Sequence, residues 1–514
     1  MHGQSCTLLP AADAEAVIGE AEAIARDAAG KEEARARRKA LQAERARQRQ
    51  AARDGRAAVR RERGRAREAE AERLRAEAEA ARAVLLERAA ELRELAGGSI
   101  RDCFGGLEEP RDPRGIRHPL PAVLALVVMA MLSGKITLVA VTAWIANAGQ
   151  HDLEMAGARH RGKDGLLTAP SPRTVTRVLG LAGPQPLSGA VGAFLAAAVP
   201  AWPAGEAEEQ EPEEKEQEEK EQEEKEQEQE KEQEPPVRPH LQCDGKEVRG
   251  ARRPDGTSMF ILSAVTARVV VADREIPAKT NEIPEIGPML LSLTRRLPLA
   301  GWVISADALH TQRELAELIV ATLRAHYVLT VKGNQKNLHA ALRGLCWAGA
   351  RRHVTEDKGH GRAERRSHLV MDAPKEIQVL FPHVRQVVKV TRTRTVRRWK
   401  GDGKTWRLVT STTTETVYLV TSLTAAHASP KQIATYIRAH WGIENQVHWV
   451  RDATLREDAS KVRAARRARN LVTLRNLTTG LINQSGLSGI AATLRDTEHD
   501  KCLLTILGRF GTTL

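Results

Sequence analysis

The sequence predicts a mixed α/β fold interrupted by a β-rich insertion, preceded by a small helical domain and a charged helical arm. Three observations predict this class. From Pro236 onward, apolar runs typical of strands alternate with helical patterns. A stretch at about 350–425 is rich in Val, Thr and Arg, a composition that indicates several further strands. Residues 104–200 contain apolar runs that indicate helices. At 514 residues the chain has room for two or three such domains.

Residues 1–100 form the first expected segment, a low-complexity Ala/Glu/Arg stretch with strong helix propensity. It has few leucines and no sustained heptad, so we expect a solvated helical or disordered arm rather than a coiled coil. The arginines of this arm could contact DNA phosphates, and an inert extension is the alternative.

Residues 104–200 form the second expected segment, a compact helical domain. The run "LPAVLALVVMAML" predicts a buried core helix, because it is too short to span a bilayer. The run "SPRTVTRVLGLAG" predicts a short helix opened by Ser171 and Pro172. Arg173 and Arg177 would share a face of that helix, which is either an ordinary surface or a DNA contact.

Residues 205–236 form an expected acidic linker, with an almost perfect EEKEQ repeat between Pro212 and Pro235. From Glu206 to Glu234 it holds 17 Glu against 4 Lys, a local net charge of −13. Dense like charge without apolar residues cannot bury a core, so we expect a disordered or transiently helical linker. Competition with nucleic acid for a basic cleft is the alternative function. The whole chain carries +13, so the remainder carries +26, which indicates a polyanionic partner.

The five cysteines indicate a reducing cytosol. They stand at positions 6, 103, 243, 346 and 502, far apart and without zinc-ligand spacing. The chain opens without the charged and apolar regions of a signal peptide, and no apolar run is long enough for a membrane span. We therefore expect DNA or RNA rather than a membrane as the partner, and a cytoplasmic, nucleoid-associated protein.

Residues 237–480 form the expected α/β domain. The runs "HLQCDG", "MFILSAVTARVVVADREI", "WVISADAL" and "HYVLTVKGN" predict strands, with helices near 283–296, 311–325 and 335–344. The stretch at about 350–425 predicts a second small sheet. Helices return from residue 430, and we expect residues 481–514 to form a helical tail.

Two aspartates close apolar strands in this domain. Asp244 ends the first strand in "HLQCDGKEVRG", and Asp307 ends a later one in "GWVISADALHTQ". Polar residues just past an apolar strand of an open α/β sheet lie where ligands bind. For Asp244, which precedes a glycine, a turn is the alternative. For Asp307, which lies between a strand and a helix, the alternative is a helix N-cap.

A third acid, Glu444, lies in "IRAHWGIENQVHWVRD" on a helix expected to begin at Ser429 and Pro430. At about 100° per residue, a stripe within roughly 60° of Glu444 holds Ile437, His440, Trp441, His448 and Arg451. This stripe predicts an inward-facing carboxylate, which needs bases or metal ions as partners. A solvated ion pair with His440 or His448 is the alternative. Three nearby acids, Asp452, Glu457 and Asp458, are alternative candidates for the role of Glu444 as the third acid.

Six motifs occur in one order along the chain: "DGKEVRG", "KTNEIPE", "ISADALHTQ", "YVLTVKGNQ", "KGHGRAERR" and "RAHWGIENQVHWVRDATLREDAS". In this the sequence resembles the insertion-sequence DDE transposases that include the H-repeat-associated proteins (the ISAs group). The resemblance covers roughly residues 237–477, and residues 104–200 are similar to the helical domain that precedes the catalytic part. It implies an RNase H-like core with a β-rich insertion.

The resemblance implies that Asp244, Asp307 and Glu444 are the catalytic triad and hold two Mg²⁺ ions, which Mn²⁺ can replace. Hard cations prefer carboxylate oxygens, and a metal pair can activate a nucleophile and stabilise a leaving oxyanion. The expected activity is cleavage and strand transfer at the terminal repeats of an insertion sequence, by a homo-oligomer on DNA. The alternatives are an inactive DNA-binding or regulatory relative and a metal-dependent nuclease without strand transfer.

Basic residues near these acids are the candidate DNA contacts, with solvated surface charge as their alternative role. Related transposases carry a Tyr-Arg-Glu-Lys signature around the glutamate, and Ile437, His440 and Arg451 stand in its other three places. In "TRTRTVRRWK", Arg392 and Arg394 would share one strand face. The full set of candidates is Lys332, Lys336, Arg438, His440, His448, Arg451, Arg392 and Arg394.

Overall fold

The structure is a computed structural model, and it describes residues 100–200, 202, 234–253, 255–276, 282–359, 361–401, 406–487 and 489–496, with isolated positions among the first 50. The chain divides into two compact units, Met1–Val84 and Leu85–Leu514, and all elements below belong to the second. Apart from a few positions, the expected arm at 1–100 and the repeat at 205–233 lie outside the described residues, as does the chain beyond Asp496.

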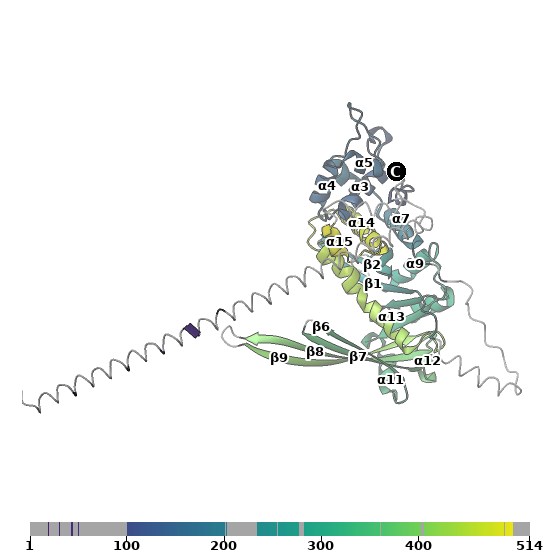
Figure 1. The fold of residues 1–514 in the computed structure, drawn as a ribbon. Helices are drawn as coiled ribbons and strands as arrows, with labels where there is room; N and C mark the ends of the chain where they lie inside the picture. The colour runs from purple at the N-terminus through teal and green to yellow at the C-terminus, as the bar shows by residue number, and fades with distance from the viewer. Residues whose placement is uncertain are drawn as a thin grey trace, which may run out of the picture. The chain divides into compact units, whose positions relative to one another are not determined.

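Short helices make up the part before residue 200 (Figure 1). They are α2 (Ile100–Cys103), α3 (Leu120–Leu132), α4 (Leu138–Ala146), α5 (Gln150–Met155), α6 (Pro172–Leu181) and α7 (Pro184–Ala197), with the 3-10 turn η1 (Pro113–Gly115). Every residue of α3 except Pro121 is buried, as its apolar run predicts. Helix α6 begins as predicted, because the Ser171 hydroxyl accepts a hydrogen bond from the Thr174 amide.

A single nine-stranded sheet, ordered β3-β2-β1-β4-β5-β9-β8-β7-β6, follows. Its strands are β1 (His240–Arg252), β2 (Ser258–Thr266), β3 (Val269–Ile276), β4 (Val303–Ala306), β5 (His326–Val331), β6 (Arg351–Gly359), β7 (Arg362–Asp372), β8 (Gln386–Gly401) and β9 (Trp406–Thr421). Strands β1, β4 and β5 are parallel to one another, and the other neighbours pair antiparallel. The predicted mixed α/β class is therefore confirmed.

The stretch at about 350–425 does not form a second sheet, so that expectation is wrong. Strands β6 to β9 lie side by side as long antiparallel strands (Figure 1). They continue the main sheet, because the last residues of β9 pair with β5, from Val328 with Thr421 to Val331 with Tyr418. This pairing joins strands about ninety residues apart, and no local pattern specifies it.

Helices cover both faces of the sheet. The connecting helices are α9 (Ile283–Thr294), α10 (Arg313–Glu317), α11 (Lys336–Gly344) and α12 (Lys375–Leu380). Between them lie the 3-10 turns η2 (Ala308–His310) and η4 (Gly333–Gln335) and the π-helical segment η3 (Leu318–Thr322). Helix α13 (Pro430–Ile443) packs on one face over Val303, Val328 and Val388. The larger core lies on the other face and includes α3, α7, α9 and α14 (Ala465–Gln484).

Helix α13 begins as predicted and ends early. Ser429 and Gln432 form a reciprocal capping box at its start. After Ile443 the chain continues as two π-helical segments, η5 (Glu444–His448) and η6 (Val450–Thr454). Wide π turns inside helices occur frequently at functional sites.

Helix α14 connects the N-terminal helices to the sheet, because it packs against α3, α6, α7 and β3. Its Arg469 forms a buried ion pair of 2.5 Å with Asp273 of β3, and Asn476 donates to the same carboxylate at 2.9 Å. Ser188 of α7 also donates to Asp273. These contacts outweigh burial and lower the pKa of Asp273. Helix α15 (Ile490–Asp496) follows α14.

Among the described residues, no single helix has the length and apolar character needed to cross a membrane. Helices α6 and α7 reach that length and character only when taken together, and they are bent by 92°.

Candidate active site

Asp244 lies inside a strand and not at its end, so both the strand-end prediction and the turn alternative are wrong. Strand β1 continues to Arg252 because β2 pairs with it, Asp244 lying opposite Ser263. On the other side, the parallel pairing of β1 with β4 stops at Cys243 and Ala306. Asp244 therefore stands where β1 separates from β4, at the carboxyl edge of the parallel strands.

Asp307 follows the end of β4 at the same level of the sheet. Its Oδ1 accepts a hydrogen bond of 3.0 Å from the Leu309 amide, so the N-cap role is confirmed for the short turn η2. The side chain is only partly buried. Capping uses one carboxylate oxygen, which leaves the other available to a ligand.

Glu444 is the first residue of the π-helical segment η5, and it is exposed. The expectation that it faces inward is therefore wrong, although Ile437, His440 and His448 of the same stripe are buried. The Glu444 carbonyl accepts a hydrogen bond from the Trp449 amide five residues later. This wider turn changes the angular position of the residues that a regular α-helix would place on one face.

The charges of Asp307 and Glu444 act on Asp244. Burial raises the pKa of Asp244 to about 7, and the negative charge of Asp307 contributes next, followed by those of Glu282 and Glu444. The Gly245 amide, which donates to Asp244 at 2.9 Å, opposes this rise. Carboxylates from β1, from the end of β4 and from η5 therefore share one electrostatic environment.

The sequence reasoning did not single out Glu282, whose negative charge also contributes to the raised pKa of Asp244. It precedes α9, and its carboxylate lies directly on Gly245, where a Cβ would overlap it. The Oε2 atom of Glu282 also lies 3.2 Å from Nε2 of the buried His310. The only sequence signal was the motif "KTNEIPE", which carries no recognisable chemistry by itself.

Two of the candidate histidines are uncharged near neutrality. Burial lowers the pKa of His440 to about 4 and that of His448 to about 3. His440 Nδ1 lies 3.1 Å from the Ser305 hydroxyl. His448 Nδ1 lies 3.5 Å from Asp244 Oδ2, which places His448 beside the carboxylates. Neither histidine balances the charge of the acids.

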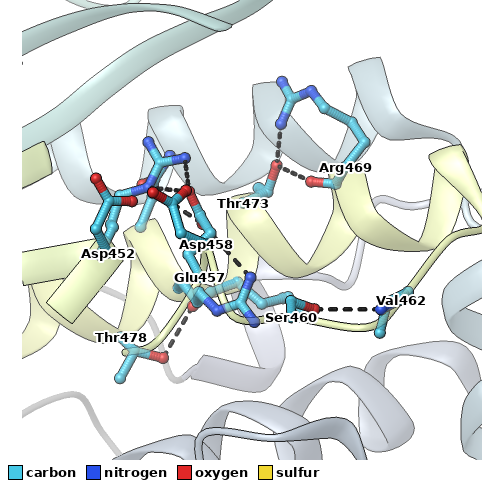
Figure 2. Close-up of polar contacts among 12 residues, drawn as sticks. Asp452, Glu457, Asp458, Ser460, Val462, Arg469, Thr473 and Thr478 are labelled. Atoms are coloured by element: carbon cyan, nitrogen blue, oxygen red, sulfur yellow. Dashed lines mark hydrogen bonds and ion pairs between the residues drawn. The ribbon is translucent and has the colours of Figure 1, made fainter. Parts of the chain in front are cut away.

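Arg451 is completely buried, which contradicts the predicted DNA contact at this residue. Its guanidinium pairs at 2.6 Å with Glu457, which also lies 3.4 Å from Arg475. Glu457, an alternative candidate for the third acid, is therefore held in ion pairs with two arginines. Figure 2 shows Glu457 in this polar network between the π-helical segment and α14.

The other two acids, Asp452 and Asp458, lie near Glu457 (Figure 2), and both form ion pairs with Lys246 of β1. The Lys246 ammonium lies 2.6 Å from Asp452 and 3.9 Å from Asp458. Asp458 does not cap the following helix, because α14 begins at Ala465. The network attaches the segment after Glu444 to the strand that carries Asp244.

The remaining basic candidates lie on exposed or partly buried positions. Lys332 and Lys336 follow β5 and are exposed. Arg438 pairs with Asp357 at 2.8 Å, whereas Arg392 pairs with Glu364 at 3.0 Å.

Arg394 has no acid partner among the residues that the structure describes, and its Nε is buried without a hydrogen bond. Arg392 and Arg394 alternate along β8 and share one face, as predicted, with Arg366 and Glu364 opposite them on β7.

The motif "GHGRAERR" supplies a buried acid to this face. Glu364 is 2% exposed and pairs with Arg362 at 2.8 Å, with Arg392 and with Arg366. Although burial raises its pKa, the arginines outweigh burial and lower it. Glu364 therefore holds three arginines on β7 and β8 in place. His360 of the same motif lies outside the described residues.

Two family models match the chain. The one described as Transposase DDE domain matches residues 218–481, which is just over half of the chain. A second, described as DDE_Tnp_1-associated, matches residues 101–195, in the helical part before the sheet. The chain belongs to the DDE transposase family. The resemblance to the H-repeat-associated transposases is thereby confirmed.

Several curated relatives are named as putative transposases. The chain is 29% identical over 252 residues to the putative transposase YncI of Escherichia coli O157:H7, covering 47% of this chain and 61% of the relative. It is 26% identical over 281 residues to the H repeat-associated putative transposase YhhI of Escherichia coli strain K12, covering 51% and 69%. The chain thus spans less than two thirds of the first of these relatives.

A solved structure of the piggyBac transposase synaptic complex with hairpin DNA covers 55% of each chain. The identity is 12% and the TM-score 0.28, which is too low to support an argument.

DDE transposases typically use a divalent metal, and the chemistry of this donor set fits one. Asp244, Asp307 and Glu444 are hard oxygen donors, and the low pKa values of His440 and His448 leave their negative charge without a balancing cation from these two histidines. Among the described residues, no three His, Cys, Asp or Glu side chains already converge as closely as a metal site requires.

Proposed function

We propose that this chain is the transposase of an insertion sequence, which binds the terminal repeats of its element and catalyses Mg²⁺-dependent DNA cleavage and strand transfer. The observation that carries the proposal is the match of residues 218–481 to the Transposase DDE domain, supported by the position of Asp244 and Asp307 at the carboxyl edge of the parallel strands β1 and β4. In this proposal β1 to β5 with α13 form an RNase H-like core, and β6 to β9 are its insertion.

Asp244, Asp307 and Glu444 would hold the metal ions. Two bound Mg²⁺ ions, or Mn²⁺ in their place, would activate a water or a 3′-hydroxyl and stabilise the leaving oxyanion. Asp307 already has one oxygen fixed by the Leu309 amide, which orients the other. The exposure of Glu444 leaves it accessible to DNA and to metal from solvent.

The basic residues would hold the DNA backbone beside these acids. Lys332 and Lys336 follow β5 at the same edge of the sheet as Asp307, because β4 and β5 are parallel. The arginines of β7 and β8 lie on strands that extend past this edge, since β9 pairs with β5 only through its last residues. Arg394, without an acid partner among the described residues, is the strongest candidate for a phosphate contact.

We propose further that the protein acts as a homo-oligomer on DNA, in the cytoplasm and associated with the nucleoid, because joining two element ends requires both ends in one complex. Light scattering of the protein with and without terminal-repeat DNA measures this state. A complex with one protein copy per two DNA ends would contradict it.

The experiment incubates the purified full chain with labelled terminal-repeat DNA, a target plasmid and Mg²⁺. Joined products support the proposal. Cleavage without joining would instead identify a metal-dependent nuclease, and binding without cleavage an inactive DNA-binding relative. Replacing Mg²⁺ with EDTA should abolish cleavage and joining while leaving DNA binding in place.

A further inference from the structure

Arg173 and Arg177 lie on an exposed face of α6, and the proposed active site uses neither of them. Both side chains are exposed on one face of the helix, while Val175 and Val178 pack inward on the other. Neither arginine pairs with an acid within the described part of the chain. An exposed positive charge without an acid partner is available to an anion from outside the chain.

The start of α14 adds a third arginine to this face. The Nε atom of Arg467 donates to the Thr176 carbonyl at 3.2 Å, and its Nη2 lies 3.6 Å from the position that a Cβ at Gly180 would take. At about 100° per residue, Thr176 and Gly180 stand within about 60° of Arg173 around the axis of α6. The guanidinium of Arg467 therefore lies beside the arginines of α6.

A buried amide fixes the two helices to each other. Asn470 of α14 is completely buried, and its Nδ2 donates to the carbonyls of Leu179 at 3.0 Å and Ala182 at 2.9 Å. These carbonyls belong to the last turn of α6 and to the residue that ends it. The arginines of α6 and α14 thus have a fixed relative position.

No acid of either helix balances these charges. Helices α6 and α14 contain no Asp or Glu, and neither does the sequence from 459 to 495. Three further basic side chains at or just before the start of α14 are exposed. A basic face without acids is the electrostatic pattern of a surface that contacts nucleic acid. The members of this α6–α14 basic surface are Arg173, Arg177, Lys461, Arg463, Arg466 and Arg467.

Strand β1 connects the α6–α14 basic surface to Asp244. Arg463 donates to the Gly250 carbonyl of β1 at 3.0 Å. Gly250 follows Asp244 by six residues, which at about 3.3 Å per residue is about 20 Å along the strand. Duplex DNA rises about 3.4 Å per base pair, so this length corresponds to about six base pairs. A duplex with one phosphodiester at Asp244 could therefore also lie against Arg463 and the helices that follow.

We propose that the α6–α14 basic surface binds phosphates of duplex DNA about six or more base pairs from the phosphodiester at Asp244. This inference rests on the proposed transposase function and adds a DNA contact outside the carboxylates. Phosphate contacts fix the register and orientation of a duplex without reading its sequence. The competing role is a solvated surface charge that contacts no ligand.

The test is DNA binding by the full chain, measured by fluorescence anisotropy across a salt series. The double variant Arg173→Gln/Arg177→Gln removes two charges and keeps good helix formers. Each lost phosphate contact should decrease the slope of log affinity against log salt by about 1, so the double variant should lose about 2. Terminal-repeat and unrelated duplexes should be affected alike, and a loss confined to the terminal repeat would overturn the assignment to phosphates.

Arg295→Gln/Arg324→Gln is the matched control. Both arginines are exposed and precede β4 and β5, at the amino edge of the parallel strands, away from Asp244. This variant should keep the slope of the unmodified chain, and an equal slope in the control and in the α6 double variant would overturn the inference. Circular dichroism checks each fold. If the α6 double variant does not fold, Arg466→Gln decides, with an expected loss of about 1 in slope.

Phosphate ethylation interference locates the contact on the DNA. Ethylated phosphates about six or more base pairs from the cleavage position should weaken binding of the unmodified chain and lose this effect in the α6 double variant. If the unmodified chain joins terminal-repeat ends and the double variant keeps its salt slope, the inference fails and the transposase proposal stands. If the unmodified chain binds no DNA, both proposals fall.

Discussion

Arg451 and Glu444 are charged residues of one segment, and the burial of their side chains distinguishes a structural role from a functional one. Seven residues apart, one is completely buried against Glu457 and the other is exposed. A buried guanidinium requires a carboxylate, because an unpaired buried charge is strongly unfavourable. An exposed carboxylate has no such requirement, so Glu444 remains free to serve a ligand.

Replacing Arg451 with Ala should therefore destabilise the protein strongly. It leaves Glu457 buried with only Arg475 at 3.4 Å, and removing one partner of a buried ion pair costs about 3–5 kcal/mol. Urea unfolding measures the change. Arg466→Ala, at an exposed position of α14, is the control and should stay within about 0.5 kcal/mol of the unmodified chain. A cost below about 1 kcal/mol for Arg451→Ala would contradict the structural role.

On strand β8, successive side chains point to opposite faces of the sheet, and this determines which arginines lie beside Glu364. Arg392 and Arg394 lie on the same face of the sheet as Glu364 and the arginines that pair with it. Arg397 lies on the opposite face and is exposed. The predicted alternation of these residues is confirmed because a strand has a period of two whatever its partners are. The ion pairs of these arginines could not be predicted from the sequence, because they depend on the pairing of β8 with β7.

Arg394→Ala should weaken binding to terminal-repeat DNA and to unrelated DNA by similar factors. Because one phosphate contact is lost, the slope of log affinity against log salt should decrease by about 1. Fluorescence anisotropy across a salt series measures both quantities. Arg397→Ala removes the same charge from the other face, and an equal effect in both variants would show that this face has no special role.

The helices α6 and α13 and the strand runs could be predicted because their signals are local: a serine cap followed by proline, or a short apolar run. The extension of β1 past Asp244 could not, because it depends on pairing with β2. The π-helical turn at Glu444 and the approach of Glu282 to Gly245 also depend on tertiary packing. The three family acids were found by resemblance.

At the scale of the whole molecule, buried histidines should make the metal-free protein sensitive to acid. Burial lowers the pKa to about 3 or 4 at His240, His326, His368, His440 and His448. The unfolded chain takes up these protons below about pH 6.5, whereas the folded chain takes them up only near pH 3 to 4. Their stabilisation is therefore complete above about pH 6.5 and is lost as the pH falls from there to about 3. Asp244 and Asp452, whose pKa values are raised, act in the opposite direction but are fewer than these histidines.

Urea unfolding in EDTA at pH 7.5 and pH 5 tests this prediction, with a lower midpoint expected at pH 5. His326→Gln, which removes one of the five histidines away from the carboxylates, should reduce the difference. A midpoint at pH 5 equal to or above that at pH 7.5 would show that these histidines do not control acid stability.

The most direct test of the central claim, that Asp244, Asp307 and Glu444 act as one metal-holding unit, is the strand-transfer rate of Asp244→Asn, Asp307→Asn and Glu444→Gln, singly and combined. Groups that act as a unit are not additive, so each single variant should lose at least about a hundredfold in rate and the triple variant little more. A single variant that keeps a rate near that of the unmodified chain would contradict the claim.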